Sequence, residues 1–447
     1  MFSHLMRRLS AGTPHRRKRT GFRLQVEDLE GKTLMTAIPI NFGATVTSAP
    51  VAMGGKVFFA AQDGAHGTQL WESNGTAAGT IRLTDGNDAH GGIRPTGLTA
   101  VGDTLYFAAG GPGGEQLWKS DGTVAGTAKV TTGNDGLAGF GIYPSNLTDV
   151  NGTLYFTGYD LHDRYQLFKS NGTAAGTGMV ADINGTTGSS PSHLTADGGV
   201  VYFQADDATG SQLWKSNGMA AGTVRLTTAA GGTHPTNLAV VGSRVLFAGF
   251  DPVNGYQLWS SDGTAAGTAR LTAVNGSHGG LSPTTPVVLD GVGYFAANDG
   301  VHGLQLWESD GTAAGTAMVT SVNAAGGGLK PTGLTVAGNA LYFTGNDGVH
   351  GLQLWESNGT AAGTARMTSL NGSSGGSTGN LTDMASALYF TAYTPAAGYQ
   401  VWQSNGTVPG TVMDTHLNTA SSVPSNLTAS GSSLFFSAPG ATLWKWS

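Results

Sequence analysis

The chain has 447 residues, of which 72 are glycine, and Asp, Glu, Lys and Arg together make up only 11%. Glu and Lys are too scarce for a helical bundle or coiled coil, and glycine lacks the every-third spacing of collagen. With 39% hydrophobic residues and nine tryptophans, the chain has enough apolar surface for a large core, which excludes wholesale disorder. The composition therefore favours an all-β protein.

Charge is distributed unevenly along the chain. Residues 1–32 hold 8 of the 22 Lys and Arg residues and three acids, so 14 basic and 25 acidic side chains remain, a net charge of −11. Because a phosphate backbone requires a basic surface, we expect no nucleic-acid partner. No run of 18 apolar residues occurs, so we expect no transmembrane segment. The absence of cysteine excludes disulfides and thiolate nucleophiles.

Residues 1–37 are expected to form a basic, disordered N-terminal targeting segment. They lack the 7–15-residue apolar run of an ordinary secretory signal. The sequence LEGKTLM at residues 29–35 resembles the L-E-P-R-x-L-L type of N-terminal segment found on bacterial surface and secreted proteins, with Gly, Lys and Met replacing Pro, Arg and the last Leu. This resemblance implies export to an extracellular or cell-surface location. A plain disordered leader is the alternative.

A repeated motif fills the chain beyond residue 40. The sequence of residues 69–80, QLWESNGTAAGT, returns with small changes at Gln116, Gln166, Gln212, Gln257, Gln305, Gln353 and Gln400. Its aromatic residue recurs at intervals of 42 to 50 positions, which indicates a repeat architecture. This residue stands at Trp71, Trp118, Phe168, Trp214, Trp259, Trp307, Trp355, Trp402 and Trp444.

Residues 95–131 illustrate the content of one unit. Short β-type runs at 98–101, 104–109, 116–120 and 128–131, here termed strands A to D, are joined mostly by Gly-containing hairpin turns. A four-stranded meander of 40–50 residues is one blade of a β-propeller. The aromatic residue of strand C is interpreted as structural, because one buried ring removes roughly 150–250 Å² from water. A ligand-stacking role is the alternative.

The two ends of the repeat region predict how the ring closes. The last unit stops after strand C at residues 443–444, whereas residues 37–42 lie where a strand D precedes the first complete unit. Pairing these ends would hide both open sheet edges. The sequence therefore predicts a propeller over residues 38–447 with nine blades, eight complete and one composite. An eight-bladed ring with a displaced end module, or two smaller rings, are the alternatives.

The repeat also resembles a known family. Residues 116–123, with Gln-Leu-Trp followed by Asp-Gly-Thr, and the clearer copies at 305–312 and 353–360 are similar to the ELWxxDGT repeat family of bacterial extracellular and surface proteins. This chain has Gln where the family has Glu, and often Asn for Asp. The resemblance implies a fold and a location, and no catalytic chemistry.

Candidate sites are expected on one face of the ring. In a propeller the B-to-C and D-to-A loops emerge on one side, and here they differ from unit to unit. We call this side the variable face; the other, with nearly invariant A-to-B and C-to-D turns, is the constant face. The densest unrepeated cluster is a candidate ligand-binding site and consists of Tyr159, Asp160, His162, Asp163, Arg164 and Tyr165.

The remaining Asp and His residues of the variable loops suggest a further option. The Asp-Gly-x-His-Gly loops at 63–67, 299–303 and 347–351 are expected to be tight turns, and no metal or cofactor is predicted. Ca²⁺ binding by these oxygen-rich loops is the alternative. No catalytic residues are predicted, because no serine-hydrolase elbow, P-loop or zinc-protease helix occurs.

The functional prediction is a non-enzymatic, exported binding module. It would act as a monomer and use its variable loops to contact a glycan or a surface protein. A propeller hydrolase or lyase that acts on extracellular glycans, through the third unit, is the alternative. A purely structural envelope component is a third hypothesis.

Overall fold

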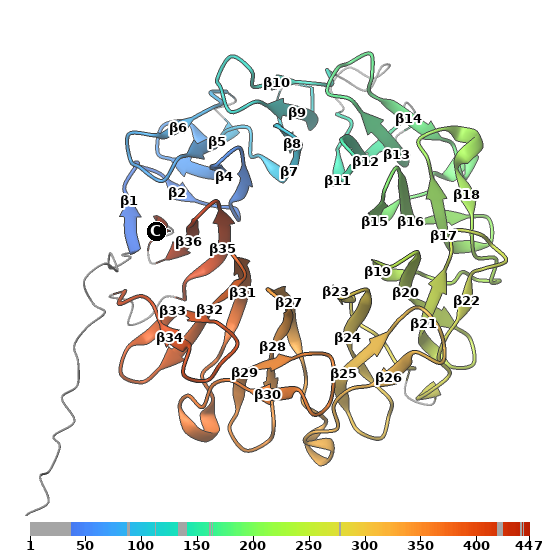
Figure 1. Ribbon diagram of the computed structural model, residues 1–447. Helices are drawn as coiled ribbons and strands as arrows, with labels where there is room; N and C mark the ends of the chain where they lie inside the picture. Colours follow the sequence, from blue (N-terminus) through green and yellow to red (C-terminus); the bar gives the residue numbers. More distant parts are fainter. Residues whose placement is uncertain are drawn as a thin grey trace, which may run out of the picture. The chain divides into compact units, whose positions relative to one another are not determined.

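The computed structural model describes residues 37–447, except 87–89, 112, 133–140, 161, 163, 277–278, 418–422, 439 and 441. Nine antiparallel blades form a ring, which confirms the nine-bladed prediction (Figure 1). No α-helix occurs in this part of the chain, and its 3-10 turns with described bounds are η2 (Gly185–Thr187), η3 (Ala220–Gly222), η5 (Ala324–Gly326) and η6 (Gly372–Ser374). The proposed targeting segment lies outside the described residues except for Ala37.

The first four complete blades follow one another along the chain, each from its inner strand outward. In blade 1 the inner strand is divided into two short pieces, both of which pair with β4. The strands of these blades are β2 (Thr45–Val46), β3 (Val51–Met53), β4 (Lys56–Asp63), β5 (Gly67–Ser73) and β6 (Thr80–Arg82); β7 (Thr96–Val101), β8 (Thr104–Ala109), β9 (Gln116–Ser120) and β10 (Ala128–Lys129); β11 (Ser145–Val150), β12 (Thr153–Tyr159), β13 (Tyr165–Ser170) and β14 (Gly178–Ala181); and β15 (Ser192–Asp197), β16 (Val200–Asp207), β17 (Gly210–Ser216) and β18 (Val224–Arg225).

Blades 5 to 8 repeat the same order, and the ninth blade joins the two ends of the propeller. Their strands are β19 (Thr236–Val241), β20 (Arg244–Asp251), β21 (Gly255–Ser261) and β22 (Ala269–Arg270); β23 (Val287–Leu289), β24 (Val292–Asn298), β25 (Leu304–Ser309) and β26 (Thr316–Met318); β27 (Thr332–Ala337), β28 (Ala340–Asn346), β29 (Leu352–Ser357) and β30 (Thr364–Arg366); β31 (Gly379–Met384), β32 (Ala387–Thr394), β33 (Gly398–Ser404) and β34 (Thr411–Met413); and β35 (Ser425–Ser430), β36 (Ser433–Ala438), β37 (Thr442–Trp446) and β1 (Ala37–Ile40).

The core consists of apolar seams between successive blades. In the seam between blades 7 and 8, Phe390 and Trp402 of blade 8 pack with Tyr342, Leu354 and Met367 of blade 7. The repeated aromatic residue of strand C is buried or half-buried in every blade. Strand B supplies one phenylalanine per blade with no solvent exposure: Phe59, Phe107, Phe156, Phe203, Phe247, Phe295, Phe343, Phe390 and Phe436. These seams therefore hold the ring together.

The repeated glutamine forms hydrogen bonds with backbone groups at the base of the variable loops. The Gln353 side chain is fully buried, and its Nε2 donates hydrogen bonds to the carbonyl oxygens of His350 and Leu370, both at 2.8 Å. Its Oε1 accepts bonds from Thr368 Oγ1 at 2.8 Å and from the Leu370 N–H at 3.0 Å. A glutamate could not donate to the two carbonyls, which explains why the amide suits this position.

The constant face is assembled from turns that are closed by their own side chains. In blade 7, Asn358 Oδ1 accepts bonds from the Thr360 N–H at 3.0 Å and from its Oγ1 at 2.8 Å, and Ser357 Oγ lies 2.7 Å from Thr364 Oγ1. Gly359 has a φ of +91°, and a β-carbon there would lie 2.1 Å from the hydroxyl of Tyr294 in the preceding blade. These hydrogen bonds and the lack of space for a side chain at Gly359 therefore explain why the turn sequence recurs.

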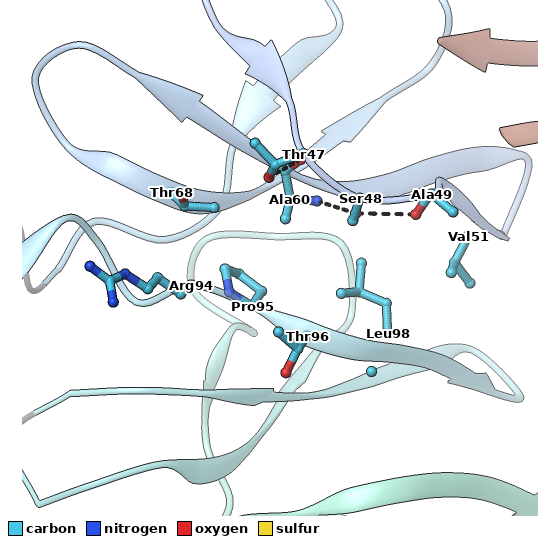
Figure 2. A pocket seen from close by; sticks show the side chains of 11 residues that line it. Thr47, Ser48, Ala49, Val51, Ala60, Thr68, Arg94, Pro95, Thr96 and Leu98 are labelled. Atoms are coloured by element: carbon cyan, nitrogen blue, oxygen red, sulfur yellow. Dashed lines mark hydrogen bonds between the residues drawn. The ribbon is translucent and has the colours of Figure 1, made fainter. Parts of the chain in front are cut away.

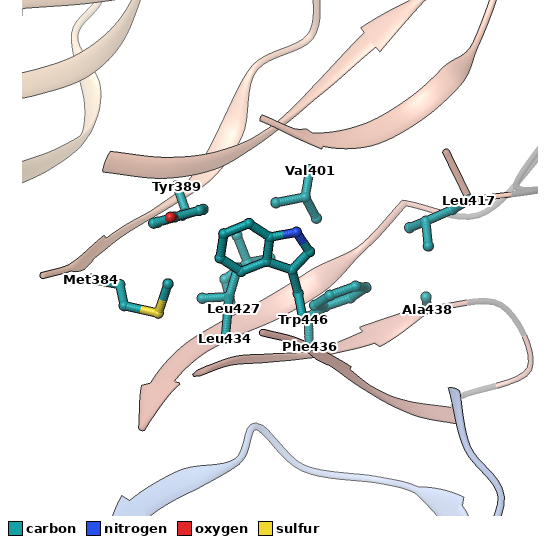
Figure 3. Close-up of a cluster of buried hydrophobic side chains, with 9 residues drawn as sticks. All are labelled: Met384, Tyr389, Val401, Leu417, Leu427, Leu434, Phe436, Ala438 and Trp446. Atoms are coloured by element: carbon teal, nitrogen blue, oxygen red, sulfur yellow. The ribbon is translucent and has the colours of Figure 1, made fainter. Parts of the chain in front are cut away.

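Closure of the ring is shown by contacts between residues far apart in the sequence. Strand β1 pairs antiparallel with β37, and Thr428 Oγ1 donates to the carbonyl of Pro50 at 3.1 Å. Figure 3 shows the seam between blade 8 and the composite blade, where the Trp446 ring lies 5.0 Å from that of Tyr389. The sequence-based prediction that residues 37–42 supply the ninth blade's outer strand is confirmed for β1.

One carboxyl group interrupts the apolar pattern of this last seam. Asp414 follows strand D of blade 8, and its N–H donates to the carbonyl of Val401 at 2.9 Å. Its Oδ2 is buried, and no described residue forms a hydrogen bond with it. Burial raises the pKa of Asp414 to about 6. The corresponding residue is apolar in the other complete blades: Leu83, Val130, Val180, Leu226, Leu271, Val319 and Met367.

We expect Asp414→Leu to stabilise the protein at pH 7 by about 1–3 kcal/mol, since each unit of pKa corresponds to about 1.4 kcal/mol. The raised pKa means that ionisation of the buried carboxyl destabilises the fold. Stability of the native protein should therefore be highest below pH 4 with respect to this group and fall as the pH rises through 6. Urea unfolding of wild type and variant between pH 4 and 8 measures this. If the stability gain of Asp414→Leu over wild type does not grow between pH 4 and pH 8, ionisation of Asp414 does not destabilise the fold.

Candidate functional site on the variable face

The recurrent aspartates of the B-to-C loops bind backbone and side-chain groups of their own loops. In blade 7, Asp347 Oδ1 accepts bonds from the N–H groups of Val349 and His350, and Oδ2 lies 2.7 Å from His350 Nδ1 and 3.6 Å from Arg366. Burial favours the neutral acid, but these hydrogen bonds outweigh it and lower the pKa of Asp347 to about 2. The Asp-Gly-x-His-Gly sequence is thus a closed turn with an ionised carboxylate.

In several blades, an arginine of strand D forms an ion pair with the aspartate of the B-to-C loop. Arg82, Arg225 and Arg270 lie 2.9, 2.7 and 2.6 Å from the aspartates Asp63, Asp207 and Asp251 of their own blades. Among the described residues, no group of three His, Cys, Asp or Glu side chains lies close enough together to hold a metal ion. Residues that differ between blades are therefore the better candidates for a ligand site.

The sequence-predicted cluster of the third unit comes together in blade 3. Asp160 is buried, and its Oδ2 lies 2.6 Å from Arg164 Nη2, while its Oδ1 accepts the N–H groups of His162 and Arg164 at 2.8 and 3.1 Å. Burial raises the pKa of Asp160, but the Arg164 guanidinium and the backbone donors lower it further, so the net shift is downward. Asp163 lies outside the described residues. The Asp160 carboxylate thus stabilises the B-to-C loop of its own blade.

The tyrosines of the cluster form a contiguous aromatic group. The rings of Tyr159 and Tyr165 are 4.1 Å apart between centroids, and Tyr143, which the sequence analysis did not select, packs edge-on against Tyr159 at 5.3 Å. The hydrogen bond with Tyr159, together with burial, raises the pKa of Tyr165 to about 12. Tyr165 is therefore a neutral phenol at physiological pH, and 37% of its surface is exposed.

Related aromatic pairs occur at the same register position in two further blades. Phe250 packs against Tyr256 at 5.5 Å in blade 5, and Tyr393 against Tyr399 at 5.1 Å in blade 8. Each is a cross-strand pair at the variable end of strands B and C. The sequence signal for these residues was available, because each unit can be aligned on its Gln-Leu-Trp motif. It was missed because only the third unit also carries a dense charge cluster.

A separate pocket lies between blades 1 and 2 (Figure 2). It has a volume of about 520 Å³, a size suited to small molecules. Thr47, Ser48 and Val51 line one side, and Pro95 and Leu98 the other. Arg94 also borders the pocket, but its Nη2 donates to the carbonyl of His90 at 2.8 Å. Thr47, Ser48 and Ala49 lie between the two pieces of the divided inner strand of blade 1, a feature that repeat spacing does not reveal.

Comparisons with known proteins add no family assignment. No protein-family model and no curated protein matches the chain. Among solved structures, it is similar to a puromycin hydrolase mutant complexed with PGG, at 14% identity and a TM-score of 0.40, covering 80% of this chain and 58% of that one. It is also similar to a prolyl endopeptidase, at 10% identity and a TM-score of 0.44, covering 88% and 54% of the two chains.

A third similar structure is a catalytically inactive virginiamycin B lyase from Staphylococcus aureus with quinupristin. The identity is 15% and the TM-score 0.38, with 68% of this chain and 94% of the lyase covered. The chain thus spans little more than half of the hydrolase and the endopeptidase, and nearly the whole lyase. Likenesses of this degree carry no functional conclusion. In the described residues, no helix is long and apolar enough to cross a membrane.

Proposed function

We propose that the protein is a non-catalytic, exported binding module whose variable face contacts a partner at the cell surface. The observation that carries this proposal is the contrast between the two faces. On the constant face, the polar side chains of the repeated turns bond to the turns themselves, as Ser357, Asn358 and Thr360 do. On the variable face, side chains change from blade to blade on an unchanged scaffold, which is typical of binding surfaces.

The chemistry of the described variable face supports binding over catalysis. The carboxylates of Asp160 and Asp347 have lowered pKa values and accept hydrogen bonds from their own loops. A general acid or base works best with a pKa near the working pH and with access to substrate. These groups meet neither requirement, so Asp160, the described carboxylate of the predicted third-unit cluster, gives no support to a hydrolase or lyase there.

A co-sedimentation experiment tests the binding role. Fluorescently labelled full-length protein is mixed with cell envelopes of the parent organism, and bound and free fractions are measured. The B-to-C segments of blades 3 and 5, residues 159–165 and 250–256, are replaced by residues 346–352 of blade 7. All three segments have seven residues and end at paired positions, so the graft preserves strand register.

We expect the grafted protein to lose at least about 90% of envelope binding, because it keeps the scaffold and loses unit-specific side chains. Asn171→Asp in a constant-face turn is the matched control and should bind as wild type does. Equal binding by the graft and the wild type, or no binding by either, would refute the role of the variable face. Fusion of residues 1–37 to a reporter tests export separately.

A further inference from the structure

The aromatic pairs of the variable face share one structural position. Strands B and C carry a cross-strand pair whose strand C member directly precedes the repeated glutamine, and in three blades both members of this pair are aromatic. We call these three pairs the aromatic rungs. They are Tyr159–Tyr165 in blade 3, Phe250–Tyr256 in blade 5 and Tyr393–Tyr399 in blade 8.

Two of the rungs carry a third ring from the preceding D-to-A loop. Tyr143 packs against Tyr159 at 5.3 Å, and His234 packs against Phe250 at 6.3 Å. Both residues have a positive φ, 48° and 45°, immediately before a proline. Arg94 has the same backbone conformation at the corresponding position of blade 2, with a φ of 51°. Several blades thus share this backbone conformation, and only the aromatic side chain is particular to blades 3 and 5.

Blade packing does not require aromatic residues at this position. Blade 6 has Asn298 paired with Leu304, and the corresponding pair of blade 1 is Gln62 with Thr68, yet both are antiparallel blades of the same ring. The six side chains of the aromatic rungs are half-buried or, for Tyr165, exposed. Partly exposed aromatic rings with polar edges are typical of recognition surfaces. A ligand explains their presence better than stability does.

Charge at the rungs points to a neutral ligand. Beside the blade 3 rung, Arg164 is paired with Asp160 at 2.6 Å, and beside the blade 5 rung, Arg270 is paired with Asp251 at 2.6 Å. These guanidinium groups are therefore compensated, and the sequence beyond residue 32 carries a net charge of −11. An acidic polymer would meet repulsion from this net charge, and the two described arginines beside these rungs are already paired. Sugar rings instead offer apolar C–H faces for aromatic stacking and neutral hydroxyls for the phenol edges.

We propose that the three aromatic rungs are stacking sites for the sugar rings of a neutral polysaccharide. The inference rests on the proposed binding role of the variable face and names its ligand class. Three rungs on different blades of one rigid ring can engage a repeating polymer at several points. Multipoint attachment strengthens binding well beyond that of one weak site. A polymer is therefore the expected ligand in preference to a single sugar.

Affinity electrophoresis of the full chain tests this proposal. Native gels contain laminarin, mannan or hydroxyethylcellulose as neutral probes, and alginate as an anionic probe. We expect at least one neutral polysaccharide to retard the wild-type protein and alginate not to do so. Tyr165→Ala should weaken retardation about threefold to tenfold, and Tyr165→Ala with Tyr256→Ala and Tyr399→Ala should abolish it.

Control variants separate stacking from folding. Tyr165→Phe and Tyr256→Phe retain the ring and should keep most of the retardation, whereas Val124→Ala and Val408→Ala alter exposed residues of constant-face turns and should have no effect. Thermal unfolding of every variant checks that the ring is intact. Retardation by no neutral probe, by alginate alone, or to the same extent for the triple alanine variant would overturn the proposal.

The envelope experiment keeps the two proposals distinguishable. Envelope binding that is lost on grafting, combined with no retardation by neutral polysaccharides, would refute the sugar-stacking role and leave the binding role standing, with a surface protein as the partner. If the grafted protein kept both envelope binding and retardation by neutral polysaccharides, the binding role of the variable face and the sugar-stacking role would both be refuted.

Discussion

Replacement of Trp446 by alanine should destabilise the protein by about 3–5 kcal/mol, the usual cost of removing a large buried aromatic side chain. Trp446 is only 4% exposed and packs with Leu417, Leu434 and Tyr389 in the seam that joins blade 8 to the composite blade. The residue at the same register position in blade 1 is Ser73, which closes a constant-face turn. The composite blade lacks that turn, and the indole occupies the seam.

Urea unfolding followed by circular dichroism measures this effect. Trp446→Phe keeps an aromatic ring and should cost less than about 1.5 kcal/mol. Ile38→Ala changes a β1 side chain that is 57% exposed and paired with Lys445, and should have little effect. If Trp446→Ala unfolds at the same urea concentration as Ile38→Ala, the closing seam does not limit the stability of the ring.

Gln353→Glu should destabilise the protein by about 3–5 kcal/mol at pH 7, because it leaves two carbonyl acceptors unpaired and buries a charge. The wild-type amide donates to the carbonyls of His350 and Leu370, both at 2.8 Å, and has no solvent exposure. An ionised carboxylate offers only acceptors to these oxygens. The substitution also tests why glutamine, and not glutamate, recurs at this position of the repeat.

The pH dependence of this effect has a defined sign. Burial would raise the pKa of the introduced carboxyl, so its cost should be smallest in acid and grow as the pH rises. Unfolding free energies of wild type and variant at pH 4 and pH 7 provide the comparison. Gln62→Glu, at an exposed position of β4, is the matched control and should remain within about 0.5 kcal/mol of wild type. Equal costs for the two substitutions would contradict the role of the buried amide.

Much of the fold follows from local sequence signals. Asp-Gly and Asn-Gly pairs mark the hairpins, and the recurring Gln-Leu-Trp motif sets the length of each unit. In blade 2 the predicted runs at 104–109 and 116–120 coincide with β8 and β9. The same logic placed residues 37–42 beside the last strand, and β1 pairs there with β37. These features were predictable because each depends on residues close together in the sequence or on a strict period.

The candidate site was predictable only in part. The residues Tyr159, Asp160, His162, Arg164 and Tyr165 stand out in the sequence because they are unrepeated and dense. The sequence could not assign their roles, because the partner of Asp160 is decided by loop geometry: Arg164 reaches it at 2.6 Å and occupies the carboxylate. Likewise, Tyr143 joins Tyr159 through a D-to-A loop from the preceding blade, a contact between separate units.

The sequence by itself determined the repeat, the four-stranded unit, the closure of the ring and the division into a constant and a variable face. Periodicity and turn chemistry are local properties, and they suffice for these conclusions. Only the tertiary structure decided which groups the loop aspartates bind, that Asp414 enters an apolar seam, and that aromatic rungs recur on three blades. Those features depend on side-chain packing and hydrogen bonding between segments, which a linear pattern does not encode.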